Sequence, residues 1–273
     1  MPFTPTHVAA ILPALPWLRR RFGGNRSVPV SALVIGSMIP DAGVFLPRFV
    51  NYNVTHTVEG LFTLCLPLGI AAFCAWEYFL KAPLIDLAPR WVRVRATNPA
   101  GPSKPPLTLR TLLWAVALTL IGAASHVLWD SFTHVGRWGV RTVPLLDEVW
   151  FTLPDWLPLR DPNIRGYKAG QYGSTFLLLP LVGLYALLRL RRREPNGAPH
   201  TAVPTRLRWA ILAAFVLLPA LAAGRDLWSS WGDLPLRWAL AKAVISAGVT
   251  LLIAVVVYAT AYAAFVRPPV AER

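Results

Sequence analysis

Charged residues are scarce in this chain of 273 residues: 15% are Asp, Glu, Lys or Arg, whereas 55% are hydrophobic. Soluble globular domains carry about 25% charged residues. The scarcity therefore argues against a soluble enzyme or binding domain. It predicts a protein that crosses a membrane several times.

Cysteines and several familiar motifs are also few or missing. The two cysteines, Cys65 and Cys74, lie nine residues apart in one apolar run. On a helix this spacing separates them by about 13 Å, too far for a disulfide. We find no P-loop, no GxGxxG, no GxSxG elbow and no internal repeat, so the common nucleotide-binding and serine-nucleophile motifs are excluded.

Five apolar runs are long enough, or nearly so, for the roughly 20 residues that a helix needs to cross a bilayer. They cover residues 60–80, 111–129, 174–190, 208–224 and 238–266. We therefore predict an all-α fold, a polytopic transmembrane helical bundle with five spans and a short N-terminal helical hairpin.

Acidic residues are the scarcer charge sign, with 13 Asp and Glu against 27 Lys and Arg. Residues 19–26, 81–110, 189–208 and 267–273 hold 18 of the 27 basic residues and only three acids. The linkers between them hold most of the acids, and the two kinds alternate as cytoplasmic and external loops do. The net charge of +14 thus reflects topology with a cytoplasmic C-terminus, and we expect no nucleic-acid partner.

The N-terminal hairpin is predicted from two shorter apolar segments, residues 8–18 and 28–39, on either side of the basic turn RRRFGGNR. Each is too short for a full span and is typical of a re-entrant or buried helix. Pro13, Pro16 and Pro29 favour kinked or broken segments. With its tip in the cytoplasm, the hairpin would open on the external side.

Histidine is rare, with five in the chain, and two of them occur in SHVLWDSFTH at the end of the second apolar run. His126, Asp130 and His134 are spaced four apart, so a continuous helix would place them on one face. The predicted topology brings six residues to the external side: His7, Asp41, His56, His126, Asp130 and His134. His200 falls in a basic linker and is interpreted as a bystander.

Imidazole and carboxylate groups together are a usual ligand set for zinc, and they also suit manganese or iron. A divalent cation would offset the cost of placing ionisable groups near membrane depth. Taken singly, each residue has a simpler interpretation, such as an interfacial histidine or a capping Asp41. For the ordered set we favour a metal site.

Several short segments in fixed order carry a family resemblance: TPTHVAAILP, SALVIGSMIPD, THTVEGLF, SHVLWDSFTH and YKAGQYGST. They resemble a bacterial membrane family known as domain of unknown function 4184, over most of the chain to about residue 190. The resemblance implies the bacterial inner membrane as location and names no reaction.

The order of the six residues is more distantly similar to the ligand order of zinc-dependent phospholipase C, P1-type nucleases and membrane-bound metal-dependent hydrolases. That resemblance implies one metal between Asp41, His56, His126 and Asp130, and a second that uses His7 and shares Asp130. His134 would begin a third site, but no HxxxE follows it. At most two metals are therefore expected, with Asp147, Glu148 or Asp155 as further acids.

These observations lead to the hypothesis of an integral-membrane metal-dependent hydrolase, acting at the external face on a phosphoester or lipid-linked substrate, with His134 and Asp130 as catalytic residues. Membrane lipids are the expected partners. The alternatives are a non-enzymatic membrane protein with a structural metal or a hydrogen-bonded His/Asp cluster, and a transporter. The expected domains are a membrane-embedded domain at 1–190, a basic linker at 191–208 and a helical pair at 209–273.

Overall fold

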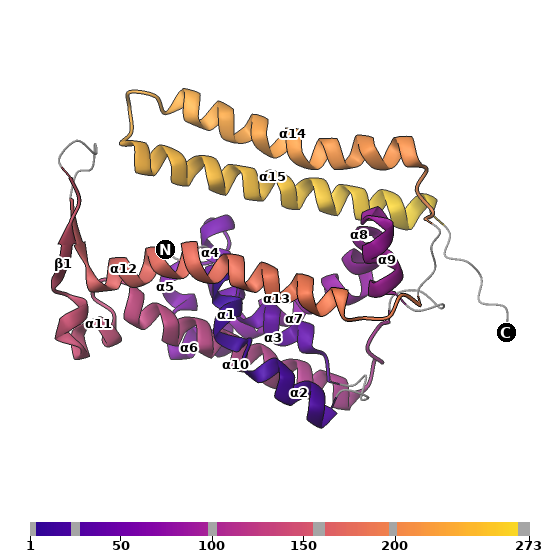
Figure 1. Ribbon diagram of the computed structural model, residues 1–273, viewed down its shortest axis with the longest axis horizontal. Coiled ribbons are helices and arrows are strands. Elements are labelled where there is room, and N and C mark those ends of the chain that lie inside the picture. Colours follow the sequence, from indigo (N-terminus) through magenta and orange to yellow (C-terminus); the bar gives the residue numbers. More distant parts are fainter. Residues whose placement is uncertain (1–3, 23–27, 98–102, 155–161, 197–200, 267–273) are drawn as a thin grey trace. The chain divides into compact units, whose positions relative to one another are not determined.

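The computed structural model describes residues 4–22, 28–97, 103–154, 162–196 and 201–266. Within these residues the protein is mostly helical and has two short strands, which confirms the predicted all-α class (Figure 1). The chain forms two compact units. The first comprises residues 1–43, 48–73 and 105–189, and the second comprises residues 44–47, 74–104 and 190–273. The domain boundaries expected at 190 and 208 stay predictions.

Five helical segments are long and apolar enough to cross a membrane: Val58–Leu87, Leu109–Thr133, Gly166–Arg191, Thr205–Ser229 and Trp238–Phe265. The first four contain the corresponding predicted apolar runs and extend beyond them, and the fifth matches the run at 238–266 except for its last residue. Polar residues at the helix ends, such as Thr108, whose side chain caps the second segment, explain this extension. The prediction of a polytopic helical bundle is thereby confirmed.

The first unit begins with the broken helices of the N-terminal hairpin: η1 (Thr4–His7), α1 (Val8–Ile11), α2 (Ala14–Phe22), α3 (Val30–Gly36) and η2 (Ile39–Asp41). The first arm is interrupted after Ile11, where Pro13 follows, as expected from the loss of a helical N–H donor. Leucine, valine and alanine side chains of these helices form one buried core with Ala115, Leu118 and Phe73.

The rest of the first unit contains the short helices α4 (Ala42–Phe45), α5 (Tyr52–Thr55) and α6 (Val58–Gly60), followed by η3 (Leu61–Cys65) and α7 (Leu66–Cys74). Its longest helix is α10 (Leu109–Thr133). After α10 come α11 (Trp138–Thr142), η5 (Pro144–Leu146), α12 (Gly166–Gly173), η6 (Ser174–Leu178) and α13 (Leu179–Arg191). The strands β1 (Val149–Thr152) and β2 (Asn163–Arg165) pair antiparallel between η5 and α12, a feature that the sequence interpretation missed.

The second unit is built on two long antiparallel helices, α14 (Thr205–Ser229) and α15 (Leu236–Phe265) (Figure 1). It also contains η4 (Ala75–Leu80), α8 (Lys81–Leu87) and α9 (Arg90–Ala96). Asp86 stabilises the segment before α14, because its carboxylate accepts hydrogen bonds from the backbone N–H groups of Ala202 and Val203. The Tyr258 hydroxyl likewise donates to the carbonyl oxygen of Pro83 at 3.2 Å.

Candidate metal centre

Helix α10 supplies two of the predicted site residues from its buried face. Thr111, Ala115, Leu118 and Gly122 are buried at intervals of three or four residues, as on one side of an α-helix. His126 and Asp130 continue this stripe for two more turns and are also buried. The stripe that packs the helix therefore carries an imidazole and a carboxylate into the interior of the first unit.

Glycines allow α3 to approach α10 closely enough to orient His126. A Cβ at Gly36 would overlap the Thr119 backbone, and a Cβ at Gly122 would overlap the Leu33 carbonyl. Small residues at such crossings let helix backbones meet in membrane proteins. As a result the carbonyl oxygen of Ser37 lies 2.8 Å from His126 Nδ1, which fixes Nδ1 as the protonated nitrogen and leaves Nε2 facing the centre.

His56 is oriented in the same way by the first residue of α5, Tyr52. Its Nδ1 lies 2.9 Å from the carbonyl oxygen of Tyr52, so this nitrogen is the donor and Nε2 carries the free lone pair. The neighbouring Thr55 hydroxyl donates to the Pro40 carbonyl at 2.7 Å. That bond ties α5 to the residue before Asp41, so the two ligand-bearing segments are held together.

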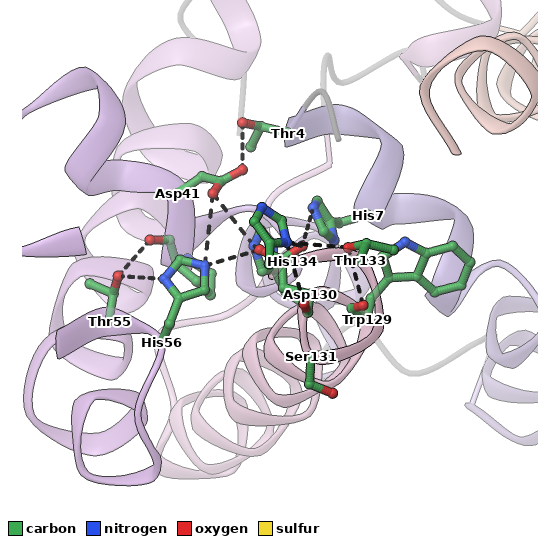
Figure 2. A network of polar contacts seen from close by, with 12 residues as sticks. Thr4, His7, Asp41, Thr55, His56, Trp129, Asp130, Ser131, Thr133 and His134 are labelled. Carbon is green, nitrogen blue, oxygen red and sulfur yellow. Dashed lines mark hydrogen bonds and ion pairs between the residues drawn. The ribbon is translucent and has the colours of Figure 1, made fainter. Parts of the chain in front are cut away.

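Asp41 lies in η2 and uses its two carboxylate oxygens differently (Figure 2). Oδ2 accepts a hydrogen bond of 2.7 Å from the Thr4 hydroxyl. Oδ1 points to the histidines, 3.5 Å from His126 Nε2 and 3.9 Å from His56 Nε2. One oxygen is therefore anchored and the other remains available as a ligand.

The structure brings Asp41, His56, His126 and Asp130 into one buried group, with one ligand atom from each lying within 4.8 Å of the others. None of the four is more than 5% exposed. Among the described residues, their inward-facing atoms make no well-formed hydrogen bond: Asp41 Oδ1, His56 Nε2, His126 Nε2 and both oxygens of Asp130. Buried polar atoms are normally satisfied, so this donor set fits a divalent cation that would satisfy all of them together.

Asp130 lies at the middle of the group and divides its oxygens between two pairs of histidines (Figure 2). Oδ2 is 3.3 Å from His56 Nε2 and 3.5 Å from His126 Nε2. Oδ1 is 3.5 Å from His7 Nε2 and 3.4 Å from His134 Nδ1. A carboxylate placed in this way can bridge two sites, or bind a cation with one oxygen and a proton carrier with the other.

His7 and His134 therefore lie beside the four-ligand group. His7 is buried and stacks on His126, with ring centroids 3.5 Å apart. His134 follows the last residue of α10, and its side chain is 17% exposed, the most of the six. Its Nε2 lies 3.4 Å from the amide nitrogen of Gln171 on α12. All six predicted residues thus occupy one region, and the role of each stays a prediction.

Burial and neighbouring charges set the protonation of the groups outside the membrane-spanning helices. Burial, followed by the nearby His126, lowers the pKa of His7 to about 4. Burial also lowers the pKa of His134, although the Asp130 carboxylate opposes it. Burial alone would raise the pKa of Asp41, but the His126 ring and the Thr4 hydrogen bond outweigh it and lower the value. At neutral pH these groups are neutral imidazoles and a carboxylate, the forms that bind metal.

Comparison with known protein families agrees with the family resemblance that the short sequence segments indicated. The family model described as Domain of unknown function (DUF4184) matches residues 1–260. The chain belongs to this family. No curated protein and no solved structure matches the chain. The resemblance to the DUF4184 family is therefore confirmed, whereas the more distant resemblance to zinc-dependent phospholipase C and P1-type nucleases stays a prediction.

The further candidate acids lie elsewhere or outside the described residues. Asp147 is exposed and forms an ion pair with Arg165 at 3.3 Å, and Glu148 is also exposed. Neither belongs to the buried four-ligand group. Asp155 and the expected bystander His200 lie outside the described residues.

The sequence interpretation missed the residues that orient the ligands. Thr4, Ser37 and Tyr52 contact the site through one hydroxyl and two backbone carbonyl groups. A carbonyl carries no side-chain signature, so Ser37 and Tyr52 could not be identified from residue type. Thr4 lies three residues before His7, within the quoted segment TPTH, and its hydroxyl was the one available signal.

Proposed function

We propose that the protein is an integral-membrane metal-dependent hydrolase that acts on a phosphoester or lipid-linked substrate at the external face of the bacterial inner membrane. The observation that carries this proposal is the position of Asp130, whose two oxygens face two separate pairs of histidines. A structural zinc ion needs four ligands. The two additional histidines around the second oxygen are more than a structural zinc ion requires, and they favour a catalytic role for the site.

Asp41, His56, His126 and Asp130 would hold the cation through the atoms that face one another. A divalent cation, with zinc as the first candidate and manganese or iron also suited to these ligands, supplies Lewis acidity and activates water at neutral pH. The Ser37 and Tyr52 carbonyl groups keep His126 and His56 in the tautomer that presents Nε2. The site is thus preorganised by groups that do not themselves touch substrate.

His134 is the residue best placed to move a proton. Its Nδ1 contacts Asp130 Oδ1, its Nε2 faces Gln171, and it is the most exposed of the six residues. Its lowered pKa keeps the ring neutral at pH 7, ready to accept a proton from water and return it to a leaving group. Asp130 would stabilise the imidazolium that forms.

The second candidate is a structural metal site in a non-enzymatic membrane protein. The near-complete burial of the four-ligand group favours it, because two aspartates and two histidines can saturate a tetrahedral ion. Hydrolysis requires His134 as a proton carrier, whereas a structural metal site does not, because His134 lies outside the four-ligand group.

The test measures hydrolysis of a chromogenic phosphodiester and of a short-chain phospholipid by the metal-loaded protein in detergent. Wild type is compared with a His134→Asn variant. We expect the variant to retain its metal and to lose about 100-fold or more in kcat, since positioned acid–base groups contribute about 10²–10⁴-fold. Wild-type kcat should fall as the pH is lowered through the pKa of His134, below the usual histidine value, because the protonated ring cannot accept a proton. Turnover that is absent in wild type, or unchanged in His134→Asn, would favour the structural role.

A further inference from the structure

The metal centre approaches solvent at one end of α10. Asp41, His56, His126 and Asp130 are almost completely buried, whereas the side chain of His134 remains 17% exposed. His134 directly follows the membrane-spanning segment that ends at Thr133. Solvent therefore reaches the site at His134, next to the end of a spanning segment, and we call this exposed edge the His134 opening.

A tight turn places an arginine at this opening. Gly136 has a φ of 74°, a left-handed conformation that favours glycine, and the Arg137 N–H donates to the His134 carbonyl at 3.3 Å. Arg137 then precedes the short helix α11 as its N-cap residue. The turn folds the chain back, so that Arg137 lies next to His134.

The guanidinium of Arg137 is available for a ligand. It is half-buried, and within the described part of the chain it forms no hydrogen bond or ion pair, unlike Arg165, which is bound to Asp147. Its charge acts on the Tyr52 phenol. Burial and the charges of Asp130 and Asp41 raise the pKa of Tyr52, and the charge of Arg137 opposes this rise. The Tyr52 ring in turn contacts the His56 ring, with centroids 4.1 Å apart.

Two exposed apolar residues lie within two positions of this arginine in the chain. Val135 is 69% exposed and Trp138 is 58% exposed. An exposed tryptophan beside the end of a spanning helix is typical of the headgroup layer, where its ring is partly buried in lipid. A cation between two such residues would lie at the depth of the lipid phosphates.

We propose that Arg137 binds the phosphate group of a membrane lipid and holds it at the His134 opening of the metal centre. Arginine suits this task because its planar fork can donate two parallel hydrogen bonds to phosphate oxygens. The inference rests on the proposed function, since it names the substrate class of that site as a lipid phosphate. Arg137 acts here as a substrate-binding residue, and the centre itself remains with the buried aspartates and histidines.

The test is calorimetric titration of the manganese-loaded protein in dodecyl maltoside with the phosphonate analogue of dihexanoyl phosphatidic acid, which cannot be hydrolysed. Inorganic phosphate is titrated in parallel. The variants are Arg137→Gln, Arg137→Lys and the matched control Arg141→Gln. Arg141 is an exposed arginine one turn further along α11, without a side-chain hydrogen bond or ion pair in the described part of the chain. Bound metal is measured in every sample.

We expect Arg137→Gln to weaken binding of the lipid analogue about tenfold or more, because it removes a charge-assisted hydrogen-bonding group. Arg137→Lys should give an intermediate loss, Arg141→Gln should bind within about twofold of wild type, and metal content should be equal in all variants. Equal effects of Arg137→Gln and Arg141→Gln would overturn the inference, as would binding of inorganic phosphate as tight as that of the lipid analogue.

The same samples separate this inference from the proposed function. A wild-type protein that holds no manganese but binds the lipid analogue in an Arg137-dependent way supports the lipid site and removes the proposed function. A protein that holds manganese and hydrolyses phosphoesters, but binds the analogue independently of Arg137, overturns the inference alone.

Discussion

The ligand histidines depend on backbone carbonyl groups for their orientation. His126 and His56 each place Nδ1 against a carbonyl oxygen, from Ser37 and Tyr52 respectively, so that Nε2 faces the carboxylates. Asp41 is anchored through one oxygen by Thr4. Such outer contacts fix the geometry of a site and commonly change metal affinity about 10–100-fold when they are removed.

Thr4 therefore provides a test at the level of one residue. We expect Thr4→Val to weaken metal affinity by about 10–100-fold without unfolding the protein, because Asp41 Oδ2 loses its donor while the ligands remain. Competition against a chelator of known affinity measures the change. The matched control is Thr63→Val, whose exposed hydroxyl bonds only to its own helix at Glu59; an equal loss in both variants would contradict the role given to Thr4.

The residue pattern predicted which residues gather, and the distant resemblance to zinc-dependent phospholipase C and P1-type nucleases also implied how they divide. The His–Asp–His spacing on one helix and the order of the other ligands indicated a shared site, because helical periodicity and loop topology are readable from residue types. That resemblance sets His7 and His134 apart from the other four, whereas residue spacing alone could not, since the division depends on the direction of each ring and on the tight crossing of α3 and α10.

Among the helices, the crossing of α3 and α10 positions the site residues. Gly36 and Gly122 permit the two backbones to meet, and this contact brings the Ser37 carbonyl to His126. The hydrophobic runs and the proline breaks made these helices predictable. The strands β1 and β2 were missed because they are only four and three residues long, too short for a clear alternating pattern.

Replacing one of these glycines tests the crossing. Gly122→Ala should destabilise the protein by about 1–3 kcal/mol and reduce metal content, because the added methyl group would overlap the Leu33 carbonyl and push α3 away. Thermal unfolding in detergent and elemental analysis measure the two effects. Gly183→Ala on α13 is the control, since a Cβ there meets nothing within 4 Å; similar losses in both variants would show that the crossing is not responsible.

At the scale of the whole molecule, five helical segments are long and apolar enough to span a membrane. Their number and approximate limits followed from the apolar runs, because bilayer thickness sets the length of a spanning helix. The orientation inferred from the distribution of Lys and Arg remains a prediction. It places the candidate metal centre on the external side and the C-terminus in the cytoplasm.

Cysteine labelling in intact cells tests this orientation. In a Cys74→Ser background, buried Cys65 should remain unreactive, so single introduced cysteines report their own side. We expect Arg141→Cys to react with a membrane-impermeant maleimide in intact cells and Lys104→Cys to react only after lysis. The reverse pattern would place the centre in the cytoplasm and remove the external site.

We infer that a divalent metal ion is held by Asp41, His56, His126 and Asp130. The most direct measurement is the elemental metal content of protein purified without chelators, beside Asp130→Asn, with Asp147→Asn and His200→Ala as controls. We expect at least one equivalent of zinc, manganese or iron in wild type and in both controls, and its loss in Asp130→Asn. Wild-type protein without metal, or equal metal in all four samples, would contradict it.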